Sequence, residues 1–186
     1  MALTATIHTF DIELADVDRH VYETIALRVA RHPSESEEYL VTRLLAYCLE
    51  YTEGIAFSSG ISHPDEPTIA VRDLTGGIRV WIEIGAPDAA RVHKAGKAAS
   101  RVAVYTHRDP DQLLRQWAAE RIHRVEALEL YSVDRALVAA FVARLDRRMT
   151  FALSRTDGHL YVTIGDVVLE GDVARISAIE GAQRLE

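Results

Sequence analysis

The chain has 186 residues, 48% of them apolar, which suits a single domain over residues 1–186 with a sizeable hydrophobic core. Its formal net charge of −7 argues against a broad surface for polyanions, because binding phosphates requires clustered lysine and arginine. Cys48 is the only cysteine, which excludes an intramolecular disulfide and a cysteine-based zinc site. No window approaches the roughly 18 apolar residues of a membrane span, and no secretory signal is visible. We therefore expect a cytoplasmic protein that does not contact a membrane.

Two strands and a helix are predicted at the start of the chain. Apolar and polar residues alternate over residues 2–13, which indicates a strand. Residues 21–30 fit either a strand or a helix, and their alternation favours a second strand paired with the first. Ser34 followed by Glu37 has the spacing of a capping box, which predicts that a helix begins there. The apolar stripe of this helix consists of Val41, Leu44, Leu45, Cys48 and Leu49.

Glu38 in this helix has two interpretations. It lies in the first turn, where the helix dipole stabilises a carboxylate. It also precedes Val41 by three residues and Leu45 by seven, which extends the apolar stripe and would direct the carboxylate toward the sheet. In the first interpretation Glu38 is an ordinary first-turn acid, and in the second it is a candidate site residue.

The most informative stretch is a predicted β-hairpin that follows a proline-containing loop. Gly76 and Gly77 suit a two-residue turn, because glycine adopts positive φ without a steric penalty. This turn sets a register whose cross-strand pairs are Thr75–Ile78, Arg72–Trp81 and Ala70–Glu83. Since side chains alternate between the two faces of a strand, Glu66 and Thr68 share the face of Glu83 in that register.

The rest of the chain alternates strands and helices. Strands are predicted at 54–57, 101–106, 125–130, 149–155, 160–164 and 167–169, and helices at 88–99, 109–120 and 132–146. Such alternation implies parallel strands joined by crossover helices. We therefore expect an α/β fold with a mixed β-sheet flanked by helices and with extra antiparallel strands from both terminal regions. No glycine-rich phosphate loop opens any helix, so we expect no nucleotide cofactor.

Charged residues around the predicted hairpin and in the helix that follows it could form a metal-dependent hydrolytic site. Hydrolysis of a phosphodiester by a hard cation needs two or more converging oxygen ligands, and a lysine that positions water or stabilises charge assists it. Asp65, Glu66, Glu83 and Lys94 supply these groups, with Lys97 as the alternative lysine. The residues thus predict a site for Mg²⁺ or Mn²⁺.

Structural roles compete with this interpretation. Glu83 could form an ion pair with Arg72, its diagonal neighbour across the hairpin. Trp81 could stack on a nucleic-acid base or pack against Arg72. The expected buried stripe of the helix at 88–99 consists of Val92, Ala95, Gly96 and Ala99. That stripe turns Lys94 away from the core, which favours a solvated side chain.

Several long segments, in the same order along the chain, resemble the bacterial YaeQ family. They are residues 1–7, 30–35, 43–46, 65–67 and 81–88, together with Lys94, and they cover almost the whole chain. The resemblance implies a variant of the PD-(D/E)xK nuclease fold, which has a restriction-endonuclease-like core. In that superfamily the acid of the PD element and the acid of the (D/E)xK strand bind Mg²⁺, and the lysine two residues later assists.

Carried onto this chain, the resemblance makes Pro64 and Asp65, with Glu66, the first element and Glu83 the second. It also makes Glu38 the acid that this fold often carries on its first helix. The pattern departs from the motif after Glu83, because Gly85 stands where the motif has lysine. Lys94 from the following helix would then replace the missing lysine.

Two functions follow as hypotheses. The first is a nuclease-like phosphodiesterase that depends on Mg²⁺ or Mn²⁺ and acts on nucleic acid. The second is a non-enzymatic binding or regulatory protein on a degenerate nuclease scaffold, acting around transcription. The clustered carboxylates favour the first hypothesis, and the acidic charge balance and the missing lysine favour the second.

Overall fold

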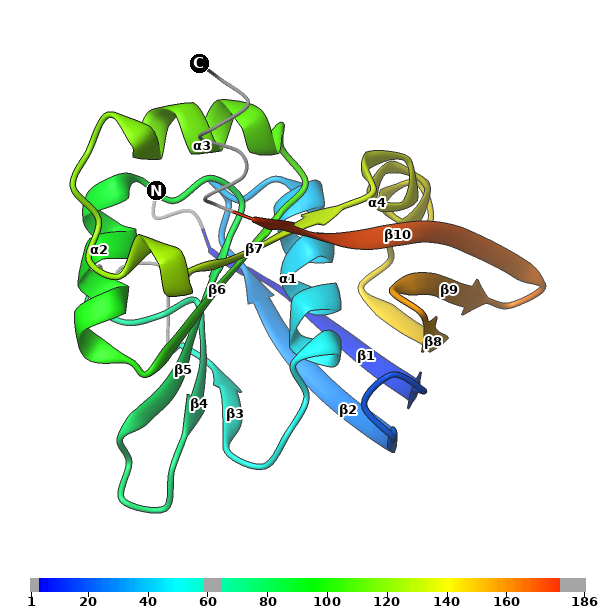
Figure 1. Cartoon of the computed structure of the whole chain (residues 1–186). Helices are drawn as coiled ribbons and strands as arrows, with labels where there is room; N and C mark the ends of the chain where they lie inside the picture. Colours follow the sequence, from blue (N-terminus) through cyan, green and yellow to red (C-terminus); the bar gives the residue numbers. More distant parts are fainter. Residues whose placement is uncertain (1–3, 59–64, 178–186) are drawn as a thin grey trace. The chain divides into compact units, whose positions relative to one another are not determined.

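The computed structural model describes residues 4–58 and 65–177 (Figure 1). The chain divides into two units. Unit 1 comprises Met1–Leu49 and Val133–Val173, and unit 2 comprises Glu50–Ser132 and Ala174–Glu186. Each unit contains both strands and helices, in agreement with the predicted mixed α/β class.

Unit 1 contains a sheet with the strand order β2-β1-β8-β9-β10. Its strands are β1 (Thr6–Asp16), β2 (Val21–Arg31), β8 (Arg148–Thr156), β9 (His159–Ile164) and β10 (Val167–Ser177), the last of which continues into unit 2. Strands β1 and β8 run parallel, and the other adjacent pairs run antiparallel. The predicted N-terminal hairpin is confirmed, and β2 is a strand rather than a helix.

The core of unit 1 forms where alternate residues of β1 meet those of β8. Phe10, Ile12 and Leu14 are buried on β1, and Ile12 lies opposite Phe151 of β8. Helix α4 (Arg135–Val142) packs on this strand through Phe141, whose ring centroid lies 5.2 Å from that of Phe151. Helix α1 (Glu37–Leu49) contacts α4.

Helix α1 begins later than the sequence predicts. Ser36 caps it, since its Oγ accepts a hydrogen bond from the Tyr39 N–H at 3.1 Å, whereas the Oγ of Ser34 contacts His32 Nδ1 at 2.7 Å. The prediction that Ser34 is the cap was therefore wrong. Glu35 precedes the helix and forms a buried ion pair with Arg43 at 3.1 Å.

Unit 2 contains a sheet with the strand order β7-β6-β5-β4-β3. Its strands are β3 (Ile55–Phe57), β4 (Ile69–Arg72), β5 (Ile78–Ile84), β6 (Arg101–Thr106) and β7 (Glu129–Val133). Strands β3, β4 and β5 pair antiparallel, while β5, β6 and β7 pair parallel. The parallel strands are joined through helices, as the alternation of elements predicts.

Helices α2 (Ala89–Ala98) and α3 (Pro110–Ala118) share one apolar cluster with this sheet. The buried members of the cluster are Trp81, Val92, Ala95, Ala99, Val102, Val104, Leu113, Leu114, Trp117, Leu128 and Leu130. Both helices begin at an aspartate N-cap, Asp88 for α2 and Asp109 for α3. Trp81 is 1% exposed within this cluster, so it does not present a surface to a base.

The register of the β4–β5 hairpin differs from the predicted one. Ala70 lies opposite Trp81, and a bulge between Val71 and Arg72 places Arg72 opposite Ile78. A five-residue loop replaces the predicted two-residue turn, because the Asp73 carboxylate accepts hydrogen bonds from Thr75 and Gly77 and closes a wider turn. The prediction that Thr68 shares the face of Glu83 survives, since the shift of register is even.

The predicted strand at 125–130 was also wrong in its first half. Val125–Ala127 form a short 3₁₀ turn, η1, which follows Arg124 in a left-handed backbone conformation. Strand β7 begins only at Glu129, where pairing with Ala103 of β6 starts.

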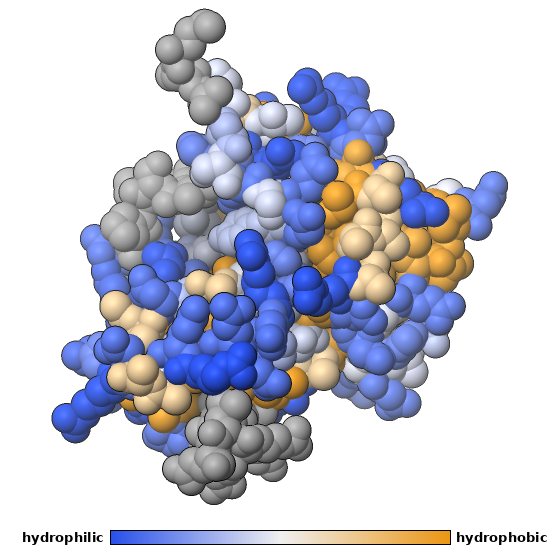
Figure 2. Space-filling model, turned by 90° about the horizontal axis from the view of Figure 1, so that it is seen from above, coloured by the Kyte–Doolittle hydropathy of each residue, from blue (hydrophilic) through white to orange (hydrophobic). Residues whose placement is uncertain are grey.

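Among the described residues, no helix is both long enough and apolar enough to cross a membrane. The face of the molecule in Figure 2 is largely hydrophilic, with apolar areas between the polar ones.

Candidate functional site

Glu83 lies near the carboxyl end of β5, on the face of the sheet that α2 and α3 cover. Only 2% of the residue is exposed. Its Oε1 accepts a hydrogen bond from Trp81 Nε1 at 2.5 Å, and its Oε2 accepts one from Thr68 Oγ1 at 2.9 Å. Burying a carboxylate is costly unless hydrogen bonds and a positive charge compensate for the lost water. Trp81 of the same strand and Thr68, just before β4, thus supply the neutral donors that Glu83 needs.

The positive charge comes from Arg91 on the first turns of α2. Its Nη2 lies 2.9 Å from Oε1 of Glu83 and also donates to the carbonyl oxygen of Glu66 at 2.8 Å. Arg91 therefore joins β5, α2 and the segment that precedes β4. The predicted ion pair between Glu83 and Arg72 was wrong, because Arg72 Nη1 donates to the carbonyl of Gly76 instead.

Lys94 follows Arg91 by one helical turn, and its Nζ forms an ion pair with Asp65. The lysine was expected to point away from the core into solvent. It is partly exposed, with 43% of its side chain accessible, but it reaches the segment before β4. Lys97 is exposed on the last turn of α2. Of the two lysines that the sequence offered, Lys94 is the one that contacts a predicted acid.

Three of the predicted site residues thus make named contacts within unit 2, and Glu66 joins them through its backbone carbonyl. Glu38 belongs to unit 1, where it lies exposed on the first turn of α1, and its carbonyl oxygen accepts a hydrogen bond from Thr42 Oγ1 at 2.7 Å. Pro64, the proline of the predicted motif, lies outside the described residues.

Sequence reasoning missed Arg91 and the roles of Thr68 and Trp81. A signal for Arg91 was available. It lies three residues before Lys94, so a helix places both side chains on one face. A signal for Thr68 was its position on the face of Glu83. A signal for Trp81 was its position two residues before Glu83 on one strand, which places both side chains on the same face.

The donor set at Glu83 does not fit Mg²⁺ or Mn²⁺ as it stands. A carboxylate offers about four lone-pair positions, and three protein donors already use this one. A divalent cation at Oε1 would also lie beside the positive charge of Arg91. Among the residues that the structure describes, no group of three His, Cys, Asp or Glu side chains is placed to hold a metal ion. The metal-binding role of Asp65, Glu66, Glu83 and Glu38 therefore stays a prediction.

A second polar cluster, which we term the Arg101 network, was not anticipated. It consists of Arg101, Glu50, Glu129, Tyr105 and Tyr131. Arg101 binds Glu50 through two nitrogens at 2.7 and 2.9 Å and binds Glu129 at 2.5 Å. The tyrosine hydroxyls donate to the same carboxylates, Tyr105 to Glu50 and Tyr131 to Glu129, and the two rings stack at 4.7 Å.

Burial and charge shift the pKa values inside the Arg101 network in opposite directions. Burial raises the pKa of Tyr105 well above its ordinary value, and the neighbouring Glu50 raises it further. Burial alone would raise the pKa of Glu129, but its hydrogen bonds and ion pair with Arg101 lower it. Every polar group of this network has a partner, which indicates a structural clamp rather than a reactive centre.

Comparison with known proteins assigns the chain to a family. A family model described as "YaeQ protein" matches residues 1–172. The chain belongs to the YaeQ family. A Salmonella typhi protein named "Uncharacterized protein YaeQ" is 35% identical over 164 residues, which are 88% of this chain and 91% of that protein. The Escherichia coli K12 protein of the same name is 34% identical over the same shares of the two chains.

Two solved YaeQ structures have the same fold. The YaeQ protein from Pseudomonas syringae matches with a TM-score of 0.84 and 27% identity, over 93% of this chain and 96% of that one. The YaeQ protein from Xanthomonas axonopodis pv. citri matches with a TM-score of 0.84 and 30% identity, over 94% and 99%. The expected YaeQ resemblance and the mixed α/β fold are thus confirmed.

Proposed function

We propose that this YaeQ chain is a non-enzymatic binding or regulatory protein on a nuclease-like, restriction-endonuclease-related scaffold. In this proposal the acids that would hold a metal ion in a nuclease instead fix α2 to the β4–β5 hairpin. The observation that carries the proposal is the buried carboxylate of Glu83, which accepts bonds from Trp81, Thr68 and Arg91.

The backbone at Gly85 supports the proposal. Gly85 has φ +81°, a conformation that side chains with a Cβ adopt only under strain, and its N–H donates to the carbonyl of Tyr105 at 2.8 Å. The nuclease motif would require lysine at this position. A lysine here would be strained, so the local backbone disfavours the motif and Arg91 supplies the cation beside Glu83.

Replacing each acid by its amide tests the proposal. Glu83→Gln leaves the guanidinium of Arg91 without its buried counter-ion, and we expect it to lower the free energy of unfolding by about 2 kcal/mol. Asp65→Asn is the matched control, because 80% of the Asp65 side chain is exposed. Surface ion pairs contribute little, so we expect the control to change stability by less than about 0.5 kcal/mol. Urea unfolding of the full chain measures both values.

Calorimetric titration of the unmodified chain with MgCl₂ and MnCl₂ completes the test. The proposal expects no saturable binding at millimolar metal. Saturable binding that is abolished both in Glu83→Gln and in Asp65→Asn would overturn the proposal. Such a result would mean that the two acids hold one metal ion together.

The second candidate is the nuclease-like phosphodiesterase that uses Mg²⁺ or Mn²⁺. The ion pair between Lys94 and Asp65 favours it, since the candidate lysine and the acid of the first motif element meet although they lie 29 positions apart. In this candidate Asp65, Glu66 and Glu83 would hold the ion, with Glu38 in support and Lys94 as the catalytic cation. Metal-dependent cleavage of DNA or RNA that Lys94→Gln abolishes without lowering the melting temperature would establish it.

A further inference from the structure

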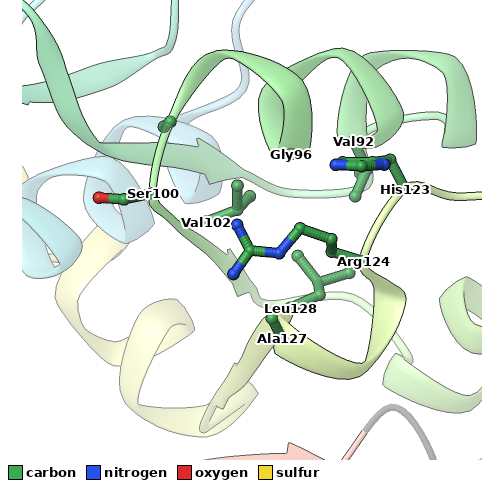
Figure 3. A pocket seen from close by; sticks show the side chains of 9 residues that line it. Val92, Gly96, Ser100, Val102, His123, Arg124, Ala127 and Leu128 are labelled. Atoms are coloured by element: carbon green, nitrogen blue, oxygen red, sulfur yellow. The ribbon is translucent and has the colours of Figure 1, made fainter.

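Unit 2 contains a small pocket that the proposed function does not use (Figure 3). It is an open hollow, and its volume of about 280 Å³ includes the solvent in front of it. Its apolar lining includes Val92 of α2, Val102 of β6 and Leu128 after η1, all of which belong to the buried cluster of the unit. The floor of the pocket is therefore the hydrophobic core itself.

Gly96 brings one wall of the pocket close to another. A Cβ at this position would lie 2.8 Å from the carbonyl oxygen of His123, so only glycine lets α2 approach the segment that carries His123 and Arg124. The pocket is thus built by a close approach of two backbones rather than left by loose side chains.

Arg124 stands at the pocket in an unusual backbone conformation. Its φ and ψ are 54° and 43°, in the left-handed region that residues with a Cβ seldom occupy. Such strain persists only where surrounding contacts enforce it, and it is concentrated at functional sites. Figure 3 shows the guanidinium extending over the side chains of Val102 and Leu128.

The guanidinium of Arg124 has no hydrogen bond or ion pair among residues 4–58 and 65–177. Ser100, the hydroxyl residue of the lining, already donates to the carbonyl of Arg79 at 2.9 Å. Beside the ring of His123, the lining therefore offers one exposed cation, the guanidinium of Arg124, above an apolar floor. A planar guanidinium binds a carboxylate through two parallel hydrogen bonds, and the floor suits an apolar group attached to it.

We propose that this pocket binds a small organic monocarboxylate, with its carboxylate on Arg124 and its apolar body against Val102 and Leu128. The inference goes beyond the proposed function, because it involves none of the residues around Glu83.

The test compares an acid with its neutral amide. The probes are 3-phenylpropanoate and 3-phenylpropanamide, titrated into the full-length chain and followed by calorimetry and by two-dimensional NMR. We expect the acid to bind at least roughly tenfold more tightly than the amide, as a charge-assisted pair predicts. The amide resonances that shift should include those of residues 96–102 and 123–128.

Three variants locate the effect. Arg124→Gln should remove the preference for the acid, while Arg121→Gln, which removes an exposed arginine from the same segment but not from the pocket, should leave it unchanged. Ala127→Phe, which fills the mouth, should weaken both probes. Equal affinity for acid and amide, an unchanged preference in Arg124→Gln, or equally tight binding of inorganic phosphate would each overturn the proposal.

Discussion

Two buried carboxylates of unit 2 are each surrounded by hydrogen-bond donors from neighbouring elements. Glu83 receives a ring N–H, a hydroxyl and a guanidinium, and Glu50 receives a hydroxyl and both terminal nitrogens of Arg101. In both places one arginine supplies the compensating charge. Removing the arginine lowers the free energy of unfolding by more than the ion pair contributes to it, because the carboxylate is left buried without a counter-ion.

At this scale we predict that Arg101→Lys destabilises the chain by about 2 kcal/mol, because an ammonium group cannot form the fork that holds Glu50 and Glu129 together. Arg79→Lys is the control, since Arg79 is exposed on β5 and the same change there should be nearly neutral. Chemical unfolding followed by circular dichroism measures both. An equal effect of the two substitutions would contradict the clamp role of Arg101.

At the scale of the elements, local sequence patterns located most strands and helices but not all of their ends. β2 follows from the alternation of apolar and polar residues, and the aspartate caps mark the starts of α2 and α3. The start of α1 was predicted at Ser34 rather than Ser36, because the local pattern carries no signal for the ion pair that Glu35 forms with Arg43 of the same helix. Strand β7 starts only after the 3₁₀ turn that follows Arg124, and no sequence pattern predicts the left-handed backbone conformation of Arg124.

The β9–β10 hairpin contains a pH-dependent contact. His159 of β9 lies 2.6 Å from Asp172 and 3.5 Å from Glu170, both on β10, and its ring contacts that of Tyr161. The hydrogen bond with Asp172 and the two negative charges raise the pKa of His159 above its ordinary value. A raised pKa in the folded state means that folding favours the protonated ring.

We therefore predict that His159 stabilises the chain at about pH 5.5, below the pKa of the unfolded histidine, and that this contribution is lost as the pH rises through the folded-state pKa. His159→Gln should lower the melting temperature at about pH 5.5 and leave it nearly unchanged at about pH 9. His20→Gln, which replaces a histidine of the β1–β2 turn, serves as the control for the substitution itself. A melting-temperature deficit of His159→Gln that is the same at both pH values would refute the linkage.

At the scale of the whole molecule, the sequence identified the family and named charged residues for a candidate site, but it did not give the contacts of those residues. The face shared by Thr68 and Glu83 followed from strand periodicity. The contact between Lys94 and Asp65 did not, because the direction of a helical side chain depends on how the helix lies on the sheet. Arg91 was overlooked for the same reason. Charged residues form a site only when the tertiary fold brings their side chains together, and local sequence patterns do not give that arrangement.

The charge of the whole chain gives the last prediction. Lysine and arginine number 21 against 28 aspartate and glutamate, a net −7, so long-range repulsion should oppose contact with any polyanion. Fluorescence anisotropy with labelled single-stranded DNA and duplex RNA should give a Kd weaker than about 100 μM at about 0.15 M salt. Lowering the salt concentration strengthens the nonspecific binding of basic proteins to nucleic acid. For this acidic chain we expect no such increase in affinity. Salt-dependent binding at micromolar concentration would require a local basic groove and would favour the phosphodiesterase over the non-enzymatic protein.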